Sequence, residues 1–211
     1  MKKVLIIGAN GRVGSQLVQK LSENGHQVWA AGRKDYGKFS TSNVRFVTMD
    51  LLSDVDALAK QMKDMDAVYF VSGSRGKDLL QVDLHGAVKT MQAAEKTGVK
   101  RYIMLSSVFA LQPERWNEAF LKEIPNYNIA KHYADLYLSR LTKLDYTILQ
   151  PGLLKEESGS GTIAVNVENP GPNAIPNVVE TLAALLEADH TIGKVITMHD
   201  GNTPILEALK S

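Results

Sequence analysis

The residue pair Tyr127 and Lys131 stands out by its spacing. The two lie four positions apart in a stretch of helical character, so both side chains should project from one face of a helix. A lysine ammonium beside a phenol favours the phenolate, and we expect it to lower the pKa of Tyr127 from its usual value of about 10. A tyrosine tuned in this way can protonate a carbonyl oxygen while a hydride arrives at the carbon.

A pair of serines precedes this helix. Ser106 and Ser107 directly follow an apolar, strand-like run, and a serine hydroxyl at a strand end can bind and orient a carbonyl oxygen. Without this context, a Tyr-x-x-x-Lys pair often lies on a solvated helix face. The context predicts that Ser107, Tyr127 and Lys131 form a catalytic group, with Ser106 as the second choice for the hydroxyl.

A glycine-rich turn follows the first apolar run of the chain. Residues 4–7 are typical of a strand buried on both faces, three glycines follow at G-x-x-G-x-x-G spacing, and a helical pattern begins at Ser15. Strand, glycine turn and helix in this order place a helix N-terminus against a pyrophosphate. The glycines permit a tight turn and a bare backbone beside the phosphates. We therefore expect a dinucleotide to bind at Gly8, Asn10, Gly11, Arg12, Val13 and Gly14.

Basic residues follow the second predicted strand, residues 27–31. An acidic side chain at this point would bind the adenosine ribose and indicate NAD. The chain instead has Arg33 and Lys34, which suit a 2′-phosphate through charge and paired hydrogen bonds. Arg12 could add a second cation. The alternative is that these are solvated loop charges, and Asp35 lies close by. The residues predict a preference for NADP(H), with NAD(H) also possible.

Composition excludes several classes of function. The chain has 211 residues, 44% hydrophobic content, a formal net charge of +1 and no cysteine. The charge gives no reason to expect nucleic acid or an anionic membrane as a partner, and disulfides or cysteine-ligated metals cannot form. The histidines show no metal-ligand spacing, so we expect no metal site. The first apolar run is too short for a signal peptide, and we expect a cytoplasmic protein.

Strand-like and helical stretches alternate along the chain, which indicates an α/β fold with a parallel sheet covered on both faces. Right-handed crossovers predict a Rossmann-type doubly wound sheet of order 3-2-1-4-5-6, with a seventh strand expected. A helix over residues 79–96 would place Leu80, Leu84, Val88, Met91 and Ala94 on one apolar face. Residues 153–176 are rich in glycine and proline and contain one plausible strand, residues 163–167. We expect a single domain, residues 1–211, with a small C-terminal substrate region.

Taken together, these motifs resemble those of atypical short-chain dehydrogenases/reductases, near the flavin/biliverdin-IXβ reductase and epimerase/dehydratase-like proteins. The resemblance rests on residues 8–14, Asp50-Leu51, Ser72-Gly73, Ser106-Ser107, residues 127–135, residues 146–152 and residues 201–205.

The resemblance also implies roles for residues outside the glycine turn. Asp50 and Leu51 would flank the adenine, and residues 72–74, including Ser72 and Gly73, would border the nicotinamide ribose. Lys131 would hold the hydroxyls of that ribose, and Pro151 and Gly152 would back the nicotinamide. Ser106 would also lie beside the cofactor.

The sequence departs from the family pattern at one helix. The asparagine that many members carry on the helix after the fourth strand is not obvious, although Asp83 stands nearby. A proton relay through that helix is therefore doubtful.

These observations favour an NAD(P)H-dependent oxidoreductase that reduces a small carbonyl, quinone or flavin-like acceptor. One alternative is a non-catalytic NADP(H) sensor that binds a protein partner, although such relatives tend to lack the Tyr/Lys pair. Another is a sugar epimerase or dehydratase that recycles its cofactor, although the C-terminal part is short for a sugar nucleotide. Segments 108–125 and 153–176 would line the substrate site of a monomer or small homo-oligomer.

Overall fold

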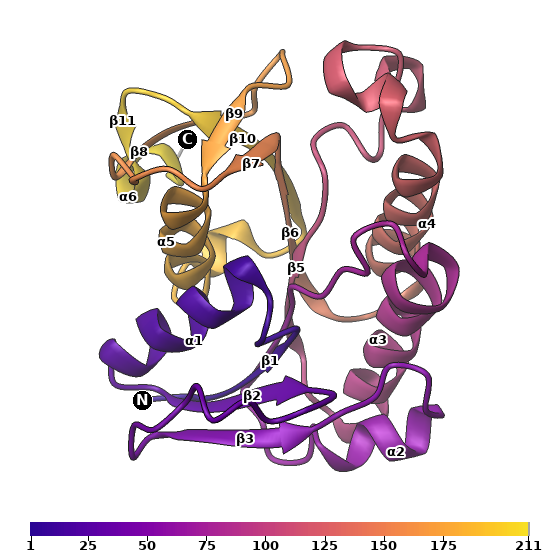
Figure 1. The fold of residues 1–211 in the computed structure, drawn as a ribbon, viewed down its shortest axis with the longest axis vertical. Helices are drawn as coiled ribbons and strands as arrows, with labels where there is room; N and C mark the ends of the chain where they lie inside the picture. Colours follow the sequence, from indigo (N-terminus) through magenta and orange to yellow (C-terminus); the bar gives the residue numbers. More distant parts are fainter. Residues whose placement is uncertain (211) are drawn as a thin grey trace.

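A computed structural model describes residues 1–210, and within this range the main sheet has nine strands in the order β11-β8-β10-β6-β5-β4-β1-β2-β3 (Figure 1). Strands β1 to β6 and β10 run parallel, and β8 and β11 are antiparallel additions at one edge. The predicted order 3-2-1-4-5-6 is confirmed, and β10 is the seventh parallel strand. The strand bounds are β1 Lys3–Ile7, β2 Gln27–Gly32, β3 Val44–Thr48, β4 Ala67–Phe70, β5 Arg101–Leu105, β6 Asp145–Pro151, β8 Thr162–Val165, β10 Lys194–Asp200 and β11 Thr203–Pro204.

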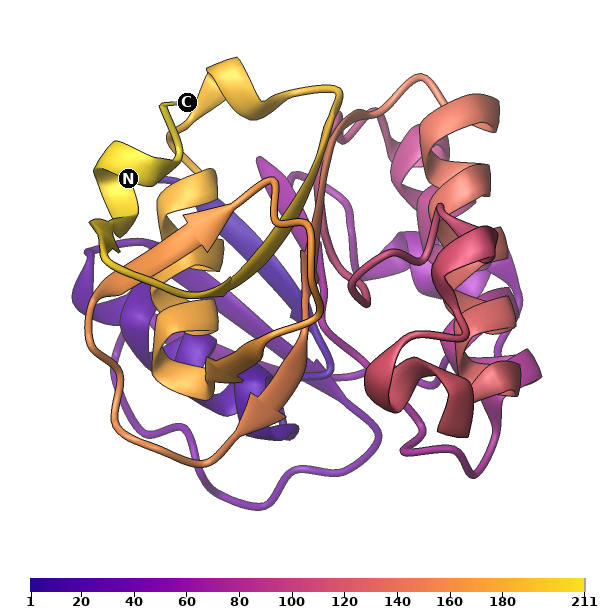
Figure 2. The same ribbon diagram turned by 90° about the horizontal axis from the view of Figure 1, so that it is seen from above.

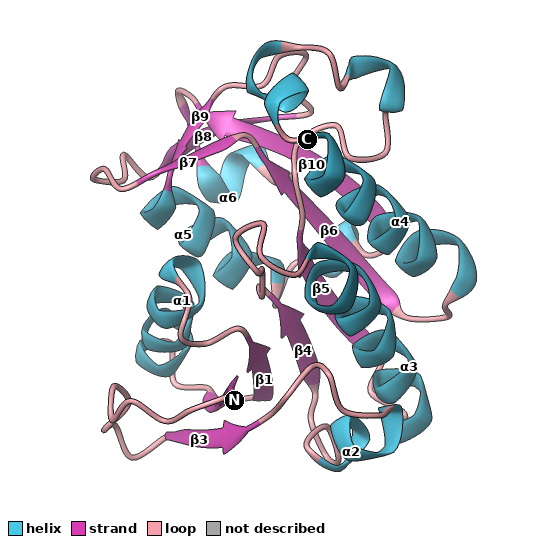
Figure 3. Cartoon of the chain, turned by 45° about the vertical axis from the view of Figure 1, so that its right-hand side comes forward, coloured by secondary structure: helices cyan, strands magenta, loops and turns pink. Residues whose placement is uncertain are grey.

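Helices cover both faces of this sheet (Figures 1 and 3). One layer contains α1 (Arg12–Glu23), α5 (Ile175–Leu185) and α6 (Ile205–Ala208), and the other contains α2 (Val55–Lys60), α3 (Ala87–Thr97) and α4 (Pro125–Leu141). Strand β1 shows why both layers are needed. Val4 and Ile6 belong to the core under the first layer, and Leu5 and Ile7 belong to the core under the second. A continuous apolar strand therefore has both of its faces buried.

The predicted helix over residues 79–96 has two parts. It begins as a π-helix, η1 (Leu79–Gly86), and continues as α3. Met91 and Ala94 are buried as expected, but Leu80 is 67% exposed, so its assignment to the apolar face is wrong. A π-helix has wider turns than an α-helix, so the 3.6-residue period does not hold before Ala87.

Two irregular segments lie at the carboxyl ends of β5 and β6. Residues 108–125 form short 3-10 turns, η2 (Pro113–Arg115) and η3 (Ala119–Glu123). The C-terminal segment forms a separate parallel pair, β7 (Leu153–Lys155) and β9 (Pro172–Ala174), in addition to β8. The strand expected at residues 163–167 is present as β8, with slightly different bounds, whereas β7 and β9 were not expected. Figure 2 shows this C-terminal segment, in orange, facing the helical layer that contains α4 across the ends of the strands.

A last short 3-10 turn, η4 (Asp189–Thr191), leads into β10. Of the helices formed by residues 1–210, none combines the length and apolar character needed to cross a membrane.

Candidate functional site

The glycine turn joins β1 to α1 with very close backbone packing. Gly8 has a φ of +96°, and a Cβ there would lie 2.7 Å from the backbone nitrogen of Ser72. A Cβ on Gly14 would lie 2.1 Å from the carbonyl oxygen of Gly8. Both positions therefore require glycine, because a side chain would force the strand ends and the helix apart.

The N-terminus of α1 opens toward this turn. Gly11 is the N-cap residue, and no side chain caps the helix there. The N–H groups of the first helical turn have no partners within the helix, and with the helix dipole they favour an anionic group at this point. Val13 and Gly14 are buried on the inner face of α1 and support the turn from below.

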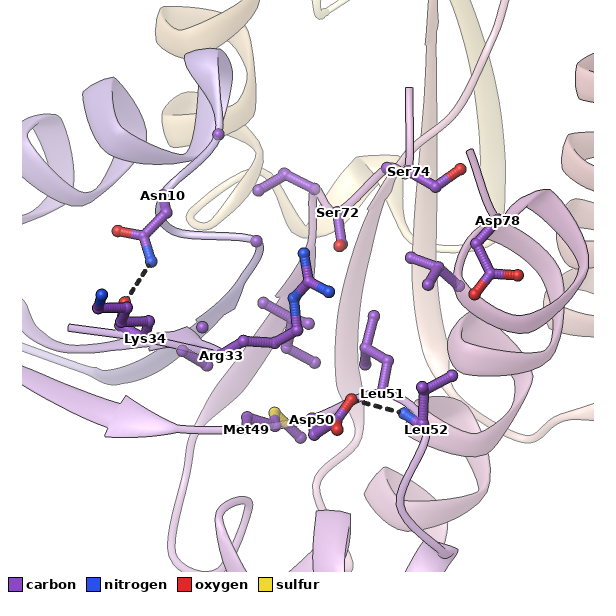
Figure 4. Close-up of a pocket in the computed structure, with 18 of the residues that line it drawn as sticks. Asn10, Arg33, Lys34, Met49, Asp50, Leu51, Leu52, Ser72, Ser74 and Asp78 are labelled. Atoms are coloured by element: carbon purple, nitrogen blue, oxygen red, sulfur yellow. Dashed lines mark hydrogen bonds between the residues drawn. The ribbon is translucent and has the colours of Figure 1, made fainter. Parts of the chain in front are cut away.

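A cavity of about 370 Å³ lies beside the turn, at the carboxyl ends of β1, β2, β3 and β4 (Figure 4). Eight of the expected cofactor residues line it: Gly8, Asn10, Gly11, Arg33, Asp50, Leu51, Ser72 and Gly73. The other seven, all within the described range, lie outside its lining: Arg12, Val13, Gly14, Ser106, Lys131, Pro151 and Gly152. The cavity thus covers the part of the site expected for adenosine and phosphates, and at Ser72 and Gly73 it extends to the part expected for the nicotinamide ribose.

Basic residues reach this cavity from the end of β2. Arg33 extends into it toward Ser72 (Figure 4), and Lys34 lies beside Asn10. The Asn10 amide donates to the Lys34 carbonyl at 2.9 Å, while its own Oδ1 is buried without a partner among the described residues. A buried acceptor of this kind is costly unless a ligand or water donates to it.

Arg12 does not contribute to the cavity as expected. Its guanidinium lies 3.3 Å from the Glu156 carboxylate, and both side chains are well exposed. Because Arg12 is the first residue of α1, its long side chain can reach outward to the loop after β7. The second cation expected at the cavity is therefore turned away from it.

The ends of β3 and β4 line opposite parts of the cavity. Asp50 accepts the N–H of Leu52 at 3.0 Å, which closes a tight turn around the buried Leu51. After β4, the backbone N–H of Ser74 donates to Asp83 Oδ2 at 2.9 Å. The hydroxyl of Ser74 and Oδ1 of Asp83 are both buried and have no partner in the part of the chain that the structure describes.

Helix α4 carries the predicted Tyr/Lys pair. The Lys131 Nζ atom lies 6.0 Å from the centre of the Tyr127 ring. It is buried and donates to the Leu105 carbonyl, the last residue of β5, at 2.8 Å. The pair therefore lies against the strand end that leads into Ser106 and Ser107.

The expected lowering of the Tyr127 pKa is wrong for the protein without a ligand. Burial raises the pKa of Tyr127 above its usual value, and the negative charges of Asp83 and Asp135 raise it further. The Lys131 ammonium donates to the Leu105 carbonyl rather than to the Tyr127 phenol. Tyr127 is therefore a neutral phenol at ordinary pH, able to donate a hydrogen bond or a proton.

The two serines have different environments. The Ser106 hydroxyl donates to Asp135 Oδ2 at 2.7 Å, and Gln150 Nε2 donates to the same oxygen at 2.8 Å. The hydroxyl of Ser106 is therefore already engaged inside the protein. Ser107 is also buried and follows it at the strand end, which favours Ser107 over Ser106 for contact with a substrate.

Pro151 and Gly152 are buried where β6 ends. The Pro151 carbonyl accepts the N–H of Val108 at 2.9 Å, and the N–H of Gly152 donates to Met198 at 3.1 Å. A Cβ on Gly152 would lie 2.0 Å from the Gly171 carbonyl oxygen. These contacts fix the position of the backbone at Pro151 and Gly152, between the two irregular segments.

Neighbouring aromatic residues hold the segment after Ser107 in place. His132 contacts the Ala110 carbonyl at 2.9 Å and packs edge-on against Trp116. Phe120 packs on a small core that includes Val108 and Phe109. The ring of His132 is thus engaged in packing and in a contact with the backbone.

Two buried carboxylates near the pair had no assigned role in the sequence interpretation. Asp83 and Asp135 are 1% and 0% exposed, and both act electrostatically on Lys131 and Tyr127. Asp135 follows Lys131 by four positions, so helical spacing alone could have placed it on the same face.

These features together fit a dinucleotide. The glycine turn leaves no space for a Cβ atom at Gly8 or Gly14, and no side chain caps the N-terminus of α1. Arg33 extends into the cavity. Asn10 and Ser74 each carry a buried polar atom that has no partner among the described residues. Cations and a helix N-terminus bind phosphates, and the unpaired atoms suit ribose and base groups.

Comparisons with known proteins agree with this geometry. A family model described as NAD(P)H-binding matches residues 8–189. The crystal structure of the oxidoreductase ylbE from Lactococcus lactis is 50% identical and superimposes with a TM-score of 0.95 over 99% of this chain and 95% of that one. A putative NAD-dependent epimerase/dehydratase from Bacillus halodurans is 33% identical, with a TM-score of 0.88 over 100% and 99% of the two chains. The uncharacterized sugar epimerase YhfK of Bacillus subtilis is 38% identical over 99% of both chains.

Proposed function

The chain belongs to the NAD(P)H-binding family, and on this basis we propose that it is an NADPH-dependent reductase of a small carbonyl, quinone or flavin-like acceptor. The observation that carries this proposal is the position of Tyr127 and Lys131. Lys131 is tied to the end of β5, which lies beside β4 in the sheet, and the end of β4 lines the cofactor cavity. A ligand extending from the cavity along these strand ends reaches the pair.

NADPH, when bound, supplies a hydride to the carbon of the acceptor. Tyr127 donates its phenolic proton to the acceptor oxygen, so that a C=O group becomes CH–OH and the phenol is later reprotonated from solvent. The raised pKa of Tyr127 keeps the phenol protonated until it is used. Ser107 donates a hydrogen bond to the same oxygen and orients it.

We assign Lys131 the role of holding the ribose hydroxyls on the nicotinamide side. Its ammonium group has three donors, and the Leu105 carbonyl uses one of them. The remaining donors are available to a ligand beside β5. Pro151 and Gly152 support the nicotinamide from the end of β6. Ser106 contributes to the same side of the site indirectly, through its hydrogen bond to Asp135.

We further propose that the enzyme prefers NADPH to NADH. Arg33 extends into the cavity and Lys34 lines it, so both can reach a 2′-phosphate. Asp50 and Leu51 then flank the adenine, and Ser72 and Gly73 border the other ribose.

The substrate would lie between segments 108–125 and 153–176. Arg115 connects the two, because its guanidinium donates to the Glu168 carbonyl and stacks 3.5 Å over the centre of the Phe109 ring. Because the two segments are linked in this way, we expect the substrate to be a small acceptor rather than a sugar nucleotide.

A second candidate function is epimerisation or dehydration with a recycled cofactor. It is supported by the relatives from B. subtilis and B. halodurans, which are described as an epimerase and as an epimerase/dehydratase. Such a reaction leaves the amount of NADPH unchanged, so it can be told apart from reduction.

The test is the stoichiometry of turnover with aldehydes, ketones, quinones, free flavins and sugars. The proposal expects one NADPH oxidised for each molecule of acceptor reduced. Product formation without loss of NADPH would support the epimerase candidate. Tight NADPH binding with no turnover of any acceptor would overturn the enzyme proposal in favour of a cofactor sensor.

A further inference from the structure

Asp135 links α4 to the ends of two strands. Its Oδ2 accepts hydrogen bonds from Ser106, after β5, at 2.7 Å and from Gln150, in β6, at 2.8 Å. The side chain is fully buried, and its Oδ1 has no partner within residues 1–210. A buried carboxylate with one free oxygen is costly unless a nearby positive charge compensates it.

Lys131 provides that positive charge from the preceding turn of the same helix. Burial lowers the pKa of Lys131, and the charges of Asp135 and Asp83 act in the opposite direction. Among residues 1–210, its ammonium has one hydrogen-bond acceptor, the uncharged Leu105 carbonyl. A fully buried lysine without opposite charges tends to lose its proton.

The charged and titratable groups facing this pair come from two elements. On α4 they are Tyr127 and His132. On η1 there is Asp83, whose Oδ2 is held by the N–H of Ser74. Strands β5 and β6 contribute only neutral groups, the Leu105 carbonyl, Ser106 and Gln150.

We propose that Asp135 is a positioning residue that acts through Lys131: its carboxylate keeps Lys131 in the ammonium form and fixes α4 against the ends of β5 and β6. This inference rests on the proposed function, in which the Lys131 ammonium holds the ribose of the cofactor. Asp135 itself touches neither cofactor nor substrate. Asp83 supports the same ammonium from η1, but its hydrogen bond to Ser74 ties it mainly to the end of β4.

A titration of Lys131 tests the inference without any cofactor. The Lys131 signal is followed by ¹³Cε NMR in lysine-labelled protein and identified by its absence in Lys131→Met. Removing a neighbouring opposite charge lowers a lysine pKa by about one unit or more, so Asp135→Asn should show that decrease. Gln150→Met is the matched control, because it removes one hydrogen bond from Asp135 but leaves every charge in place.

The expected result is a lowered Lys131 pKa in Asp135→Asn and a nearly unchanged one in Gln150→Met. An unchanged Lys131 pKa in Asp135→Asn, or equal decreases in both variants, would overturn the inference. If Asp135→Asn does not fold, Asp135→Ser removes the same charge and leaves room for water. Asp135→Glu should return the Lys131 pKa toward the wild-type value.

NADPH binding separates this inference from the proposed function. At about pH 9, the affinity of Asp135→Asn for NADPH should fall toward that of Lys131→Met, while the two differ at neutral pH. A uniform loss of affinity at every pH would show only a structural role for Asp135 and would overturn the inference. Failure of the wild-type protein to bind NADPH would overturn the proposed function, and the NMR titration would still decide the role of Asp135.

Discussion

The backbone of Gly14 lies so close to Gly8 that a Cβ at residue 14 would come within 2.1 Å of the Gly8 carbonyl oxygen. Gly14→Ala must therefore move α1 away from the end of β1. We expect a loss of about 3 kcal/mol in the free energy of unfolding, since the clash is with backbone rather than with a flexible side chain. NADPH binding should be lost with it.

Denaturant unfolding and NADPH titration measure both effects. Gly25→Asn is the control, because Gly25 has a φ of +82°, which asparagine tolerates, and a Cβ there meets nothing within 4 Å. Wild-type stability and binding in Gly14→Ala would show that the turn is not as tight as described.

Arg33 sets the cofactor preference in this account. Loss of a charge-assisted contact costs about 1.5–3 kcal/mol, so Arg33→Ala should weaken NADPH binding by roughly 10- to 100-fold. Its affinity for NADH should hardly change, because NADH lacks the 2′-phosphate. The measurement is the Kd of each cofactor by fluorescence titration.

Arg45→Ala is the matched control for Arg33, since Arg45 is an exposed arginine on β3 that does not line the cavity. Equal losses for NADPH and NADH in Arg33→Ala, or no preference for NADPH in the wild type, would contradict the assignment of Arg33.

Stability should depend on pH through Asp135. Burial raises the pKa of Asp135 from its usual 3.8 to about 6, and the charge of Lys131 with the hydrogen bonds from Ser106 and Gln150 only partly offsets this. Between about pH 4 and 6 the unfolded chain has released this proton while the folded protein still holds it. Wild-type stability should therefore fall as the pH rises through this window, by on the order of 2–3 kcal/mol.

Asp135→Asn lacks this titration. The difference in unfolding free energy between wild type and Asp135→Asn should thus shift in favour of the variant by a similar amount from about pH 4 to 7. Urea unfolding of both proteins at each pH measures it. A difference that does not vary with pH would mean that Asp135 titrates normally.

Local pattern was sufficient to predict the sheet order and several of the residues that line the cavity beside the glycine turn. Apolar strands, the spacing of Gly8 and Gly14, and the position of Arg33 after a strand are all visible within short stretches of sequence. The placement of Tyr127 and Lys131 on one helix was predictable for the same reason, since four-residue spacing fixes their common helix face.

Features that depend on tertiary packing were missed. The π-helix at η1 changes the helical period and leaves Leu80 exposed, which no apolar pattern indicates. The Tyr127 pKa depends on burial and on Asp83, a residue from a different helix. The hydrogen bonds to Asp135 come from Ser106, which follows β5, and from Gln150 in β6, and these two residues meet only because β5 and β6 are neighbours.

The most direct test of the account is the rate of NADPH oxidation by Tyr127→Phe with an acceptor that the wild type reduces. Loss of a positioned acid should lower kcat by about 10²- to 10⁴-fold, with little change in the Kd for NADPH. Tyr133→Phe is the control, because Tyr133 is on the same helix but is 54% exposed. Wild-type turnover in Tyr127→Phe would contradict the account, because hydride transfer would then need no proton from Tyr127.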